Sequence, residues 1–346
     1  MRQAIDLAIE ERRASLEPLH VEQVWLDSSA GEAGEWSASK EAANAAAAVQ
    51  DQAVVAYIGA YNSGATAISL PITRKAGLLQ ISPTNTWPGL TSPGYDDPSA
   101  AEVQQPGRTT FLRLMPGDDD QGRAAAIWAE QMGVRHALVV SDASTYSAGL
   151  GRAFQEVAPQ RGIEISGTAE LEDILRRGSL QANRADAVFY APGSVNDAVR
   201  FASAPPSLQD VEHIFLSDVA LTDEFLEAAV PDPRKKWHVI FNGIDMPEAS
   251  PSTDAFQTAF KKKYGSDPSQ FAANAYDAAV LVIDALAVVR SADRGAVLDR
   301  VTGATAQTDT TGPLAFNSHG DRTRWSMSGY DVVQGTFKLA TVINGP

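Results

Sequence analysis

Strand-like and helix-like hydrophobic patterns alternate along most of the chain. Short apolar runs are followed by longer stretches in which apolar residues recur every three or four positions. This alternation is typical of parallel βαβ units, and it predicts an α/β fold with mostly parallel sheets flanked by helices. The first series comprises helices at 1–14, 38–50 and 64–76 and strands at 21–26, 53–58, 78–81 and 110–114.

A second series follows a hinge-like break at Pro116-Gly117-Asp118, and a loop rich in Pro, Gly, Asp and Ser is predicted at 92–108. Near the C-terminus, apolar and polar residues alternate around Gln334-Gly335, as they do in an antiparallel hairpin. The predicted strands are 137–140, 163–168, 187–190, 213–216, 238–242, 314–316, 326–333 and 337–343, and the predicted helices are 121–132, 148–160, 195–202, 254–264, 271–289 and 295–301.

Composition narrows the class of protein. A chain of 346 residues with 44% hydrophobic and 21% charged residues is long enough for two globular domains. The formal charge of −15 argues against a nucleic-acid partner, which requires a basic surface. The absence of cysteine excludes disulfides, thiolate zinc sites and a Cys nucleophile. No apolar run approaches the roughly 20 residues of a membrane span, and no signal peptide is visible.

Two polar turns are the strongest candidate for a binding site. Asn62-Ser63-Gly64 follows one predicted strand, and residues 82–86 (Ser-Pro-Thr-Asn-Thr) follow the next. Ligands of open parallel sheets bind outside the carboxyl ends of the strands, where both turns are expected. The turns offer hydroxyls and backbone N–H groups without positive charge, which suits a carboxylate or another small polar group.

Motifs for catalysis or for a cofactor are weak. The five histidines lie far apart without metal-ligand spacing, and neither a G-x-S-x-G elbow nor a Walker A motif occurs. Gly149-Leu150-Gly151 lacks the third glycine of a dinucleotide fingerprint. Asp118-Asp119-Asp120 stands at a predicted helix start, where acidic residues complement the helix dipole. The sequence therefore predicts a protein that is not an enzyme and has no cofactor or metal.

Several stretches resemble the type I periplasmic binding proteins of the branched-chain amino acid transport family. The resemblance implies two lobes, each with a doubly wound sheet, that close on a ligand in a cleft between them. It places lobe I at 1–116 plus 247–326 and lobe II at 117–246 plus 327–346, with chain crossings near 115–118, 243–247 and 325–328. The resembling stretches are 59–66, 81–91, 142–150, 187–193, 215–218, 275–278 and 312–321.

The resemblance also implies roles for individual residues. Ser63, Thr84 (through its backbone) and Thr86 match the turns that bind the ligand's α-carboxylate, and Asp218 matches the acidic residue that pairs with its ammonium group. Tyr146 is expected to close over the ligand from lobe II. Each of these residues also has a purely structural reading, as a helix cap, a turn residue or a packing residue.

Three further residues concern the shape of the pocket. Ser194 stands where amino-acid binders often carry an aromatic ring, so a larger or more polar ligand side chain would fit there. Tyr61 and Trp87 flank the two turns and could form apolar walls of the pocket, or pack half-buried.

The function implied is that of an extracytoplasmic solute-binding protein of an ABC importer. It would be a monomer that binds an amino acid or related small zwitterion by lobe closure and delivers it to a membrane permease. A sensory domain of the same fold is one alternative, and an enzyme on a doubly wound fold is another. Family members open with a strand and a Ser/Gly-rich loop before the first helix, whereas this sequence begins at the helix. We therefore expect that segment upstream of Met1 in the natural chain.

Overall fold

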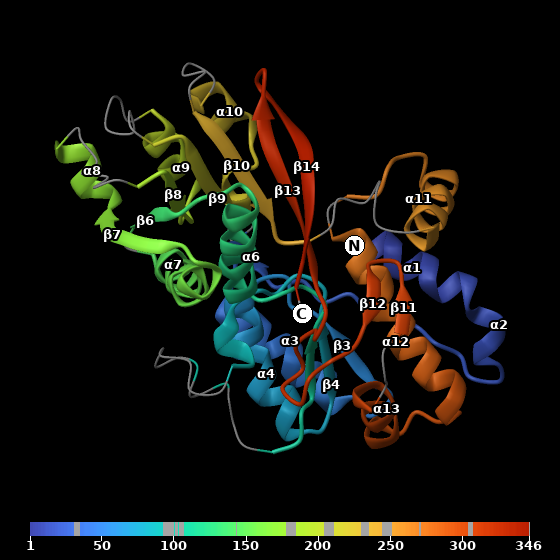
Figure 1. The fold of residues 1–346 in the computed structure, drawn as a ribbon. Coiled ribbons are helices and arrows are strands. Elements are labelled where there is room, and N and C mark those ends of the chain that lie inside the picture. The colour runs from blue at the N-terminus through green and yellow to red at the C-terminus, as the bar shows by residue number, and fades with distance from the viewer. Residues whose placement is uncertain are drawn as a thin grey trace. The chain divides into compact units, whose positions relative to one another are not determined.

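The chain folds into two compact units (Figure 1). Unit 1 comprises Met1–Pro116 and Met246–Arg324, and unit 2 comprises Gly117–Asp245 and Trp325–Pro346. The chain therefore passes between the units three times. The computed structural model describes residues 1–30, 35–92, 100, 103, 107–142, 144–177, 185–203, 211–229, 235–243, 251–269, 271–303 and 307–345.

Unit 1 contains a three-stranded parallel sheet in the order β3-β4-β5. Its strands are β3 (Ala56–Ile58), β4 (Leu79–Ser82) and β5 (Phe111–Arg113). Two short antiparallel pairs accompany it: β1 (Ser29–Ala30) with β2 (Glu35–Trp36), and β11 (Gln307–Asp309) with β12 (Gly312–Leu314). The helices of this unit are α1 (Arg2–Glu11), α2 (Arg13–Leu16), α3 (Ala38–Gln50), α4 (Ser63–Lys75), α11 (Pro251–Tyr264), α12 (Ala272–Val289) and α13 (Arg294–Thr302).

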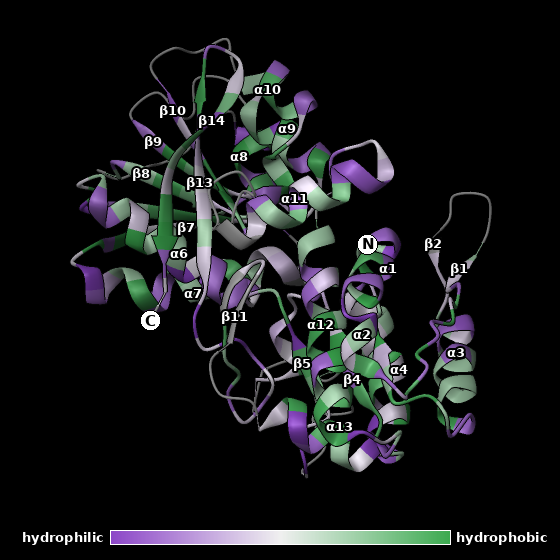
Figure 2. Cartoon of the chain, turned by 90° about the vertical axis from the view of Figure 1, so that its right-hand side faces the viewer, coloured by the Kyte–Doolittle hydropathy of each residue, from purple (hydrophilic) through white to green (hydrophobic). Residues whose placement is uncertain are grey.

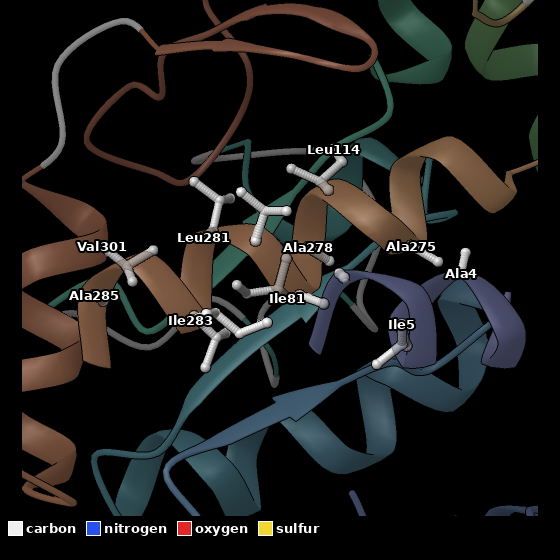
Figure 3. Close-up of a cluster of buried hydrophobic side chains, with 14 of the residues drawn as sticks. Ala4, Ile5, Ile81, Leu114, Ala275, Ala278, Leu281, Ile283, Ala285 and Val301 are labelled. Carbon is white, nitrogen blue, oxygen red and sulfur yellow. The ribbon is translucent and has the colours of Figure 1, made fainter. Parts of the chain in front are cut away.

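The core of unit 1 is built around α12. Eleven of its hydrophobic residues are buried, and they pack with α1, α13 and the sheet (Figure 3). Ile81 of β4 and Leu114 meet α12 residues such as Ala278 in this cluster. By length and composition α12 could cross a membrane, but 67% of it is buried inside the fold. Its apolar character is thus explained by the core.

Unit 2 contains a seven-stranded sheet in the order β14-β13-β10-β9-β8-β6-β7. Neighbouring strands from β7 to β10 run parallel, and β13 and β14 add an antiparallel hairpin at one edge. Its elements are α6 (Asp118–Gln131), β6 (His136–Ser141), α7 (Thr145–Val157), β7 (Glu164–Glu170), α8 (Leu171–Arg177), β8 (Ala187–Tyr190), α9 (Val195–Ala202), β9 (His213–Ser217), α10 (Asp223–Ala229), β10 (Lys236–Phe241), β13 (Ser326–Val333) and β14 (Thr336–Asn344).

Alternation along these strands gives the sheet two buried faces. Phe189 and Phe215 pack with α6 and α7 on one face, whereas the neighbouring Val188 and Ile214 pack with α8, α9 and α10 on the other. Strands β8 and β9 are therefore buried at every position and are largely hydrophobic (Figure 2). The observed architecture confirms the predicted α/β class.

Not every predicted element is present. The predicted strand at 21–26 is wrong, because these residues have no strand partner among the described residues, and Val24 is 72% exposed. A segment of strand-like composition does not form a strand without a neighbour to pair with. Helices α8 and α10 were not predicted. Most of the predicted loop at 92–108, and part of the predicted crossing at 243–247, lie outside the described residues.

Candidate functional site

The two polar turns of unit 1 are joined to each other by hydrogen bonds. They follow the carboxyl ends of β3 and β4, which pair in parallel. The Thr84 hydroxyl donates to the Tyr61 carbonyl at 2.6 Å, and Asn85 Nδ2 donates to the carbonyls of Tyr61 at 3.0 Å and Ala60 at 3.2 Å. Ser82 Oγ also donates to the Ala60 carbonyl, at 3.1 Å. These bonds fix the first turn on the second.

Ser63 lies at the point where the two turns meet. It is the first residue of α4, and its N-cap neighbour Asn62 makes no side-chain cap. The backbone N–H groups of Thr86 and Trp87 both reach Ser63 Oγ at 3.4 Å, which is long for such bonds. These two N–H groups would form stronger hydrogen bonds with a negatively charged oxygen than with the neutral Ser63 hydroxyl, because charge-assisted hydrogen bonds are shorter and stronger. This arrangement suits a carboxylate.

A buried arginine binds the second turn through two of its backbone carbonyls. Arg113 is 2% exposed and donates through NH1 to the carbonyls of Thr86 at 2.9 Å and Trp87 at 3.1 Å. Its Nε donates to Asp321 Oδ1 at 2.7 Å, which balances its charge. By holding the Thr86 carbonyl, Arg113 fixes the orientation of the Thr86–Trp87 peptide group, which presents the Trp87 N–H to Ser63. Arg113 was not predicted as a site residue, and its signal in the sequence is a charge within the apolar strand predicted at 110–114.

Aromatic rings flank the same turns. Tyr61 is 55% exposed and packs edge-on against Phe271, with ring centroids 6.2 Å apart. The Trp36 ring lies against Gly64, so closely that a Cβ there would come within 2.8 Å of it. Trp87 packs partly buried against the cluster around Leu70. Unit 1 therefore places apolar surface beside its amide and hydroxyl groups.

In unit 2, three side chains meet at the carboxyl end of β9. Asp218 directly follows this strand and is partly buried. Its Oδ1 accepts from Gln121 Nε2 at 3.0 Å and from the Tyr146 hydroxyl at 3.3 Å. The Tyr146 hydroxyl also lies 3.1 Å from Gln121 Oε1. We call Gln121, Tyr146 and Asp218 the carboxylate triangle.

The electrostatics of the triangle follow from burial. Loss of water raises the pKa of Asp218, while hydrogen bonds from Gln121, Tyr146 and the Asn242 backbone act to lower it. Burial also raises the pKa of Tyr146 well above its usual range, helped by the carboxylates of Asp218 and Asp118. Tyr146 is therefore a neutral donor at physiological pH. Asp218 is a hydrogen-bonded acceptor that has lost part of its hydration.

Ser194 belongs to a different turn of unit 2. It caps α9, accepting from the Asp197 N–H at 3.1 Å and donating to Asp197 Oδ2 at 2.6 Å. The N–H of the preceding Gly193 donates to Asp142 Oδ2 at 2.7 Å. The same oxygen accepts from the Tyr190 hydroxyl at 2.9 Å. Within the described chain, no hydrogen bond joins Ser194 to the carboxylate triangle.

The structure thus groups the predicted residues into two half-sites. The unit 1 half-site holds Tyr61, Ser63, Thr84 and Thr86, and the unit 2 half-site holds Tyr146 and Asp218, with Ser194 on a neighbouring loop. Their roles in ligand binding stay predictions. Across the ranges that the structure describes, no three His, Asp or Glu side chains are placed to hold a metal ion.

Comparison with known proteins identifies the family. The sequence profile described as periplasmic binding protein matches residues 21–336 of this two-unit α/β chain. The chain belongs to the periplasmic binding protein family, as the resemblance predicted. A sequence search of curated proteins found no match.

Solved structures of similar fold agree with this family. A substrate-binding protein of an ABC transporter from Desulfitobacterium hafniense, in complex with Leu, has a TM-score of 0.77 at 22% identity, covering 98% of this chain and 95% of that one. The leucine-binding protein LivK from Thermotoga maritima gives 0.73 at 22% identity, covering 99% and 93%. A solute-binding protein from R. palustris in complex with benzoate gives 0.68 at 16% identity, covering 99% and 90%. At these identities the likeness establishes the fold.

Proposed function

We propose that the protein is the extracytoplasmic solute-binding component of an ABC importer, and that its ligand is an amino acid or a related small zwitterion. The carboxylate triangle carries this proposal. A carboxylate that is partly stripped of water and held by neutral donors, Gln121 and Tyr146, gains strongly from a cationic ligand group. The leucine complex of the D. hafniense protein is consistent with this class of ligand.

Each half-site would recognise one end of the ligand. The carboxylate would be bound by the Ser63 hydroxyl and by the backbone amides at Thr84 and Thr86 in unit 1. The Thr84 hydroxyl is bonded to the Tyr61 carbonyl at 2.6 Å, whereas the Thr84 N–H makes only a long bond to Ser82 Oγ at 3.3 Å, so Thr84 would turn this N–H from Ser82 to the ligand. Asp218 would bind the ammonium group in unit 2, and Tyr146 would cover it.

Capture would require no chemistry on the ligand. The two units would close around it, since a ligand stabilises a closed state through contacts made only there. The partner would be a membrane permease that receives the ligand. We propose that the protein acts as a monomer outside the cytoplasm and is not an enzyme. A ligand-sensing domain of the same fold is the alternative, and it would keep the binding properties but lack the permease partner.

Small aromatic acids are a second candidate ligand class. Tyr61, Phe271 and Trp36 place aromatic surface beside the amide and hydroxyl groups of unit 1, and the R. palustris protein of similar fold binds benzoate. Such ligands would use the unit 1 half-site without Asp218. Their affinity would therefore not depend on Asp218, whereas the affinity for an amino acid would.

A thermal-shift screen tests the proposal. Protein refolded free of carried-over ligand is melted with amino acids, amides and small aromatic acids. Ligand at 100 times its Kd adds about 2.7 kcal/mol to folded-state stability, which is visible as a shift in melting. Shifts with a few zwitterions, and none with their amine-free counterparts, are expected. Shifts only with amine-free acids would assign the second class, and a flat screen would contradict both.

A further inference from the structure

Gln121 is a buried polar residue whose hydrogen bonds have a fixed direction. It lies in the first turns of α6 and is 1% exposed. Its Nε2 donates to the Ile240 carbonyl at 2.8 Å and to Asp218 Oδ1 at 3.0 Å. A carbonyl only accepts, so the amino group must face Ile240 and Asp218 while Oε1 faces Tyr146. A flipped amide would set oxygen against both acceptors.

This direction determines what the Tyr146 hydroxyl can do. A phenol has one proton to donate, yet two acceptors lie within reach, Gln121 Oε1 at 3.1 Å and Asp218 Oδ1 at 3.3 Å. Tyr146 can therefore leave Asp218 for Gln121 without losing its hydrogen bond. A cationic ligand group could therefore take the place of Tyr146 at Asp218 Oδ1, because the Tyr146 hydroxyl can donate to Gln121 Oε1 instead.

Other groups also act on the carboxylate triangle. Asp118, on the same helix as Gln121, lies close enough to act on Tyr146, and the Asn242 backbone and the N–H of Asp218 itself also donate to the Asp218 carboxylate. Burial works against the ionised form of Asp218, so the carboxylate depends on these donors. Gln121 is itself held by strand β10, through the Ile240 carbonyl.

We propose that Gln121 is a positioning residue of the unit 2 half-site: it fixes the orientation of the Asp218 carboxylate, keeps it a strong acceptor, and takes over the Tyr146 hydroxyl when a ligand cation binds Asp218. This inference rests on the proposed function only where it concerns the ligand. Its effect on Asp218 exists in the ligand-free protein and is measured there.

The test uses three variants of the full chain. Gln121→Leu removes both the donor and the alternative acceptor, and Tyr146→Phe removes only the hydroxyl. Gln155→Leu is the matched control, because Gln155 donates only locally, to the Gly151 carbonyl on α7. Carbon-13 NMR follows the Asp218 carboxyl through a pH titration without ligand, with Asp218→Asn identifying the resonance. Calorimetry gives the affinity for L-leucine across the same pH range.

Loss of the Gln121 bond should move the Asp218 titration to higher pH by about one pH unit, the scale of one hydrogen bond to a charged group. Tyr146→Phe should move it in the same direction by less, and Gln155→Leu should not move it. The pH below which leucine binding is lost should rise in parallel in Gln121→Leu.

An Asp218 midpoint that is unchanged in folded Gln121→Leu would overturn the proposal. If Gln121→Leu does not fold, Gln121→Met, which is as long as Gln but lacks its donor and acceptor, takes its place, and an unchanged midpoint there would overturn the proposal. A shifted midpoint in a protein that binds no zwitterion would support the positioning role and contradict the proposed function. The two failures are therefore distinguishable.

Discussion

The two half-sites present opposite kinds of chemistry. In unit 1 the candidate groups are backbone amides and a hydroxyl, and the buried Arg113 donates to the Thr86 carbonyl of the same turn. In unit 2 the candidate group is one carboxylate, held by two side chains. A half-site built from backbone spreads recognition over several groups, whereas a half-site built on one side chain concentrates it. Replacement of one residue should therefore affect stability most in unit 1 and ligand choice most in unit 2.

The largest expected effect is on the stability of unit 1. Arg113→Leu removes the cation that pairs with Asp321 and the donor to two carbonyls, and breaking a buried ion pair costs about 3 kcal/mol or more of unfolding free energy. Arg161→Leu is the control, because its pair with Glu130 is about 40% exposed on both sides and should contribute about 1 kcal/mol or less. Denaturant unfolding measures both. Equal losses would refute the supporting role of Arg113.

The next effect is on binding in unit 2. Asp218→Asn should weaken binding of a zwitterion by about 1.5–3 kcal/mol, the range for hydrogen bonds to charged groups. The same change should leave an amine-free acid bound as before, because the unit 1 half-site is intact. Titration calorimetry with both ligands checks this. An unchanged zwitterion affinity would remove Asp218 from the site.

A smaller effect is expected at Ser63. Ser63→Ala removes one neutral hydroxyl beside the amides of Thr86 and Trp87, which corresponds to about 0.5–1.5 kcal/mol of binding. The loss should be equal for zwitterions and amine-free acids. Ser39→Ala, an exposed serine in the first turn of α3, is the control. A loss confined to zwitterions would contradict the assignment of unit 1 to the carboxylate.

The smallest effect concerns pH and stability. The pKa of Asp218 is raised in the folded protein by burial. Its stabilising contribution is thus present below the pKa of the unfolded chain and is lost as pH rises through the folded value. Asp218→Asn, which resembles the protonated form, should therefore raise the melting temperature of ligand-free protein more at pH 7.5 than at pH 4. An equal change at both pH values would show that ionisation of Asp218 does not destabilise the folded protein.

Elements defined by local pattern were predictable from sequence. The C-terminal hairpin is an example, because apolar and polar residues alternate on both sides of Gln334-Gly335, where β13 and β14 are joined. Gln334 and Gly335 adopt the positive φ angles of such a turn, 54° and 74°. The predicted strand at 21–26 failed because pairing depends on a neighbour that no local pattern reveals. The α/β class was confirmed since many buried strands indicated it together.

The site was predictable only in part for the same reason. The turns at Ser63 and Thr86 follow strands, so their position could be inferred from the strand order. The roles of Gln121 and Arg113 arise from partners far away in sequence, Asp218 and Asp321, 97 and 208 residues apart. A lone Gln at a helix start and a lone Arg in a strand give no sign of such contacts.

The most direct test of the division of roles is calorimetry on wild type, Asp218→Asn and Ser63→Ala with two matched ligand pairs. The pairs are L-leucine with 4-methylpentanoate and L-phenylalanine with 3-phenylpropanoate, which differ only in the amine. We predict that the preference for the amine-bearing member falls about tenfold or more in Asp218→Asn and is unchanged in Ser63→Ala. A wild-type protein that binds both members of each pair equally would contradict the assignment of unit 2 to the ammonium group.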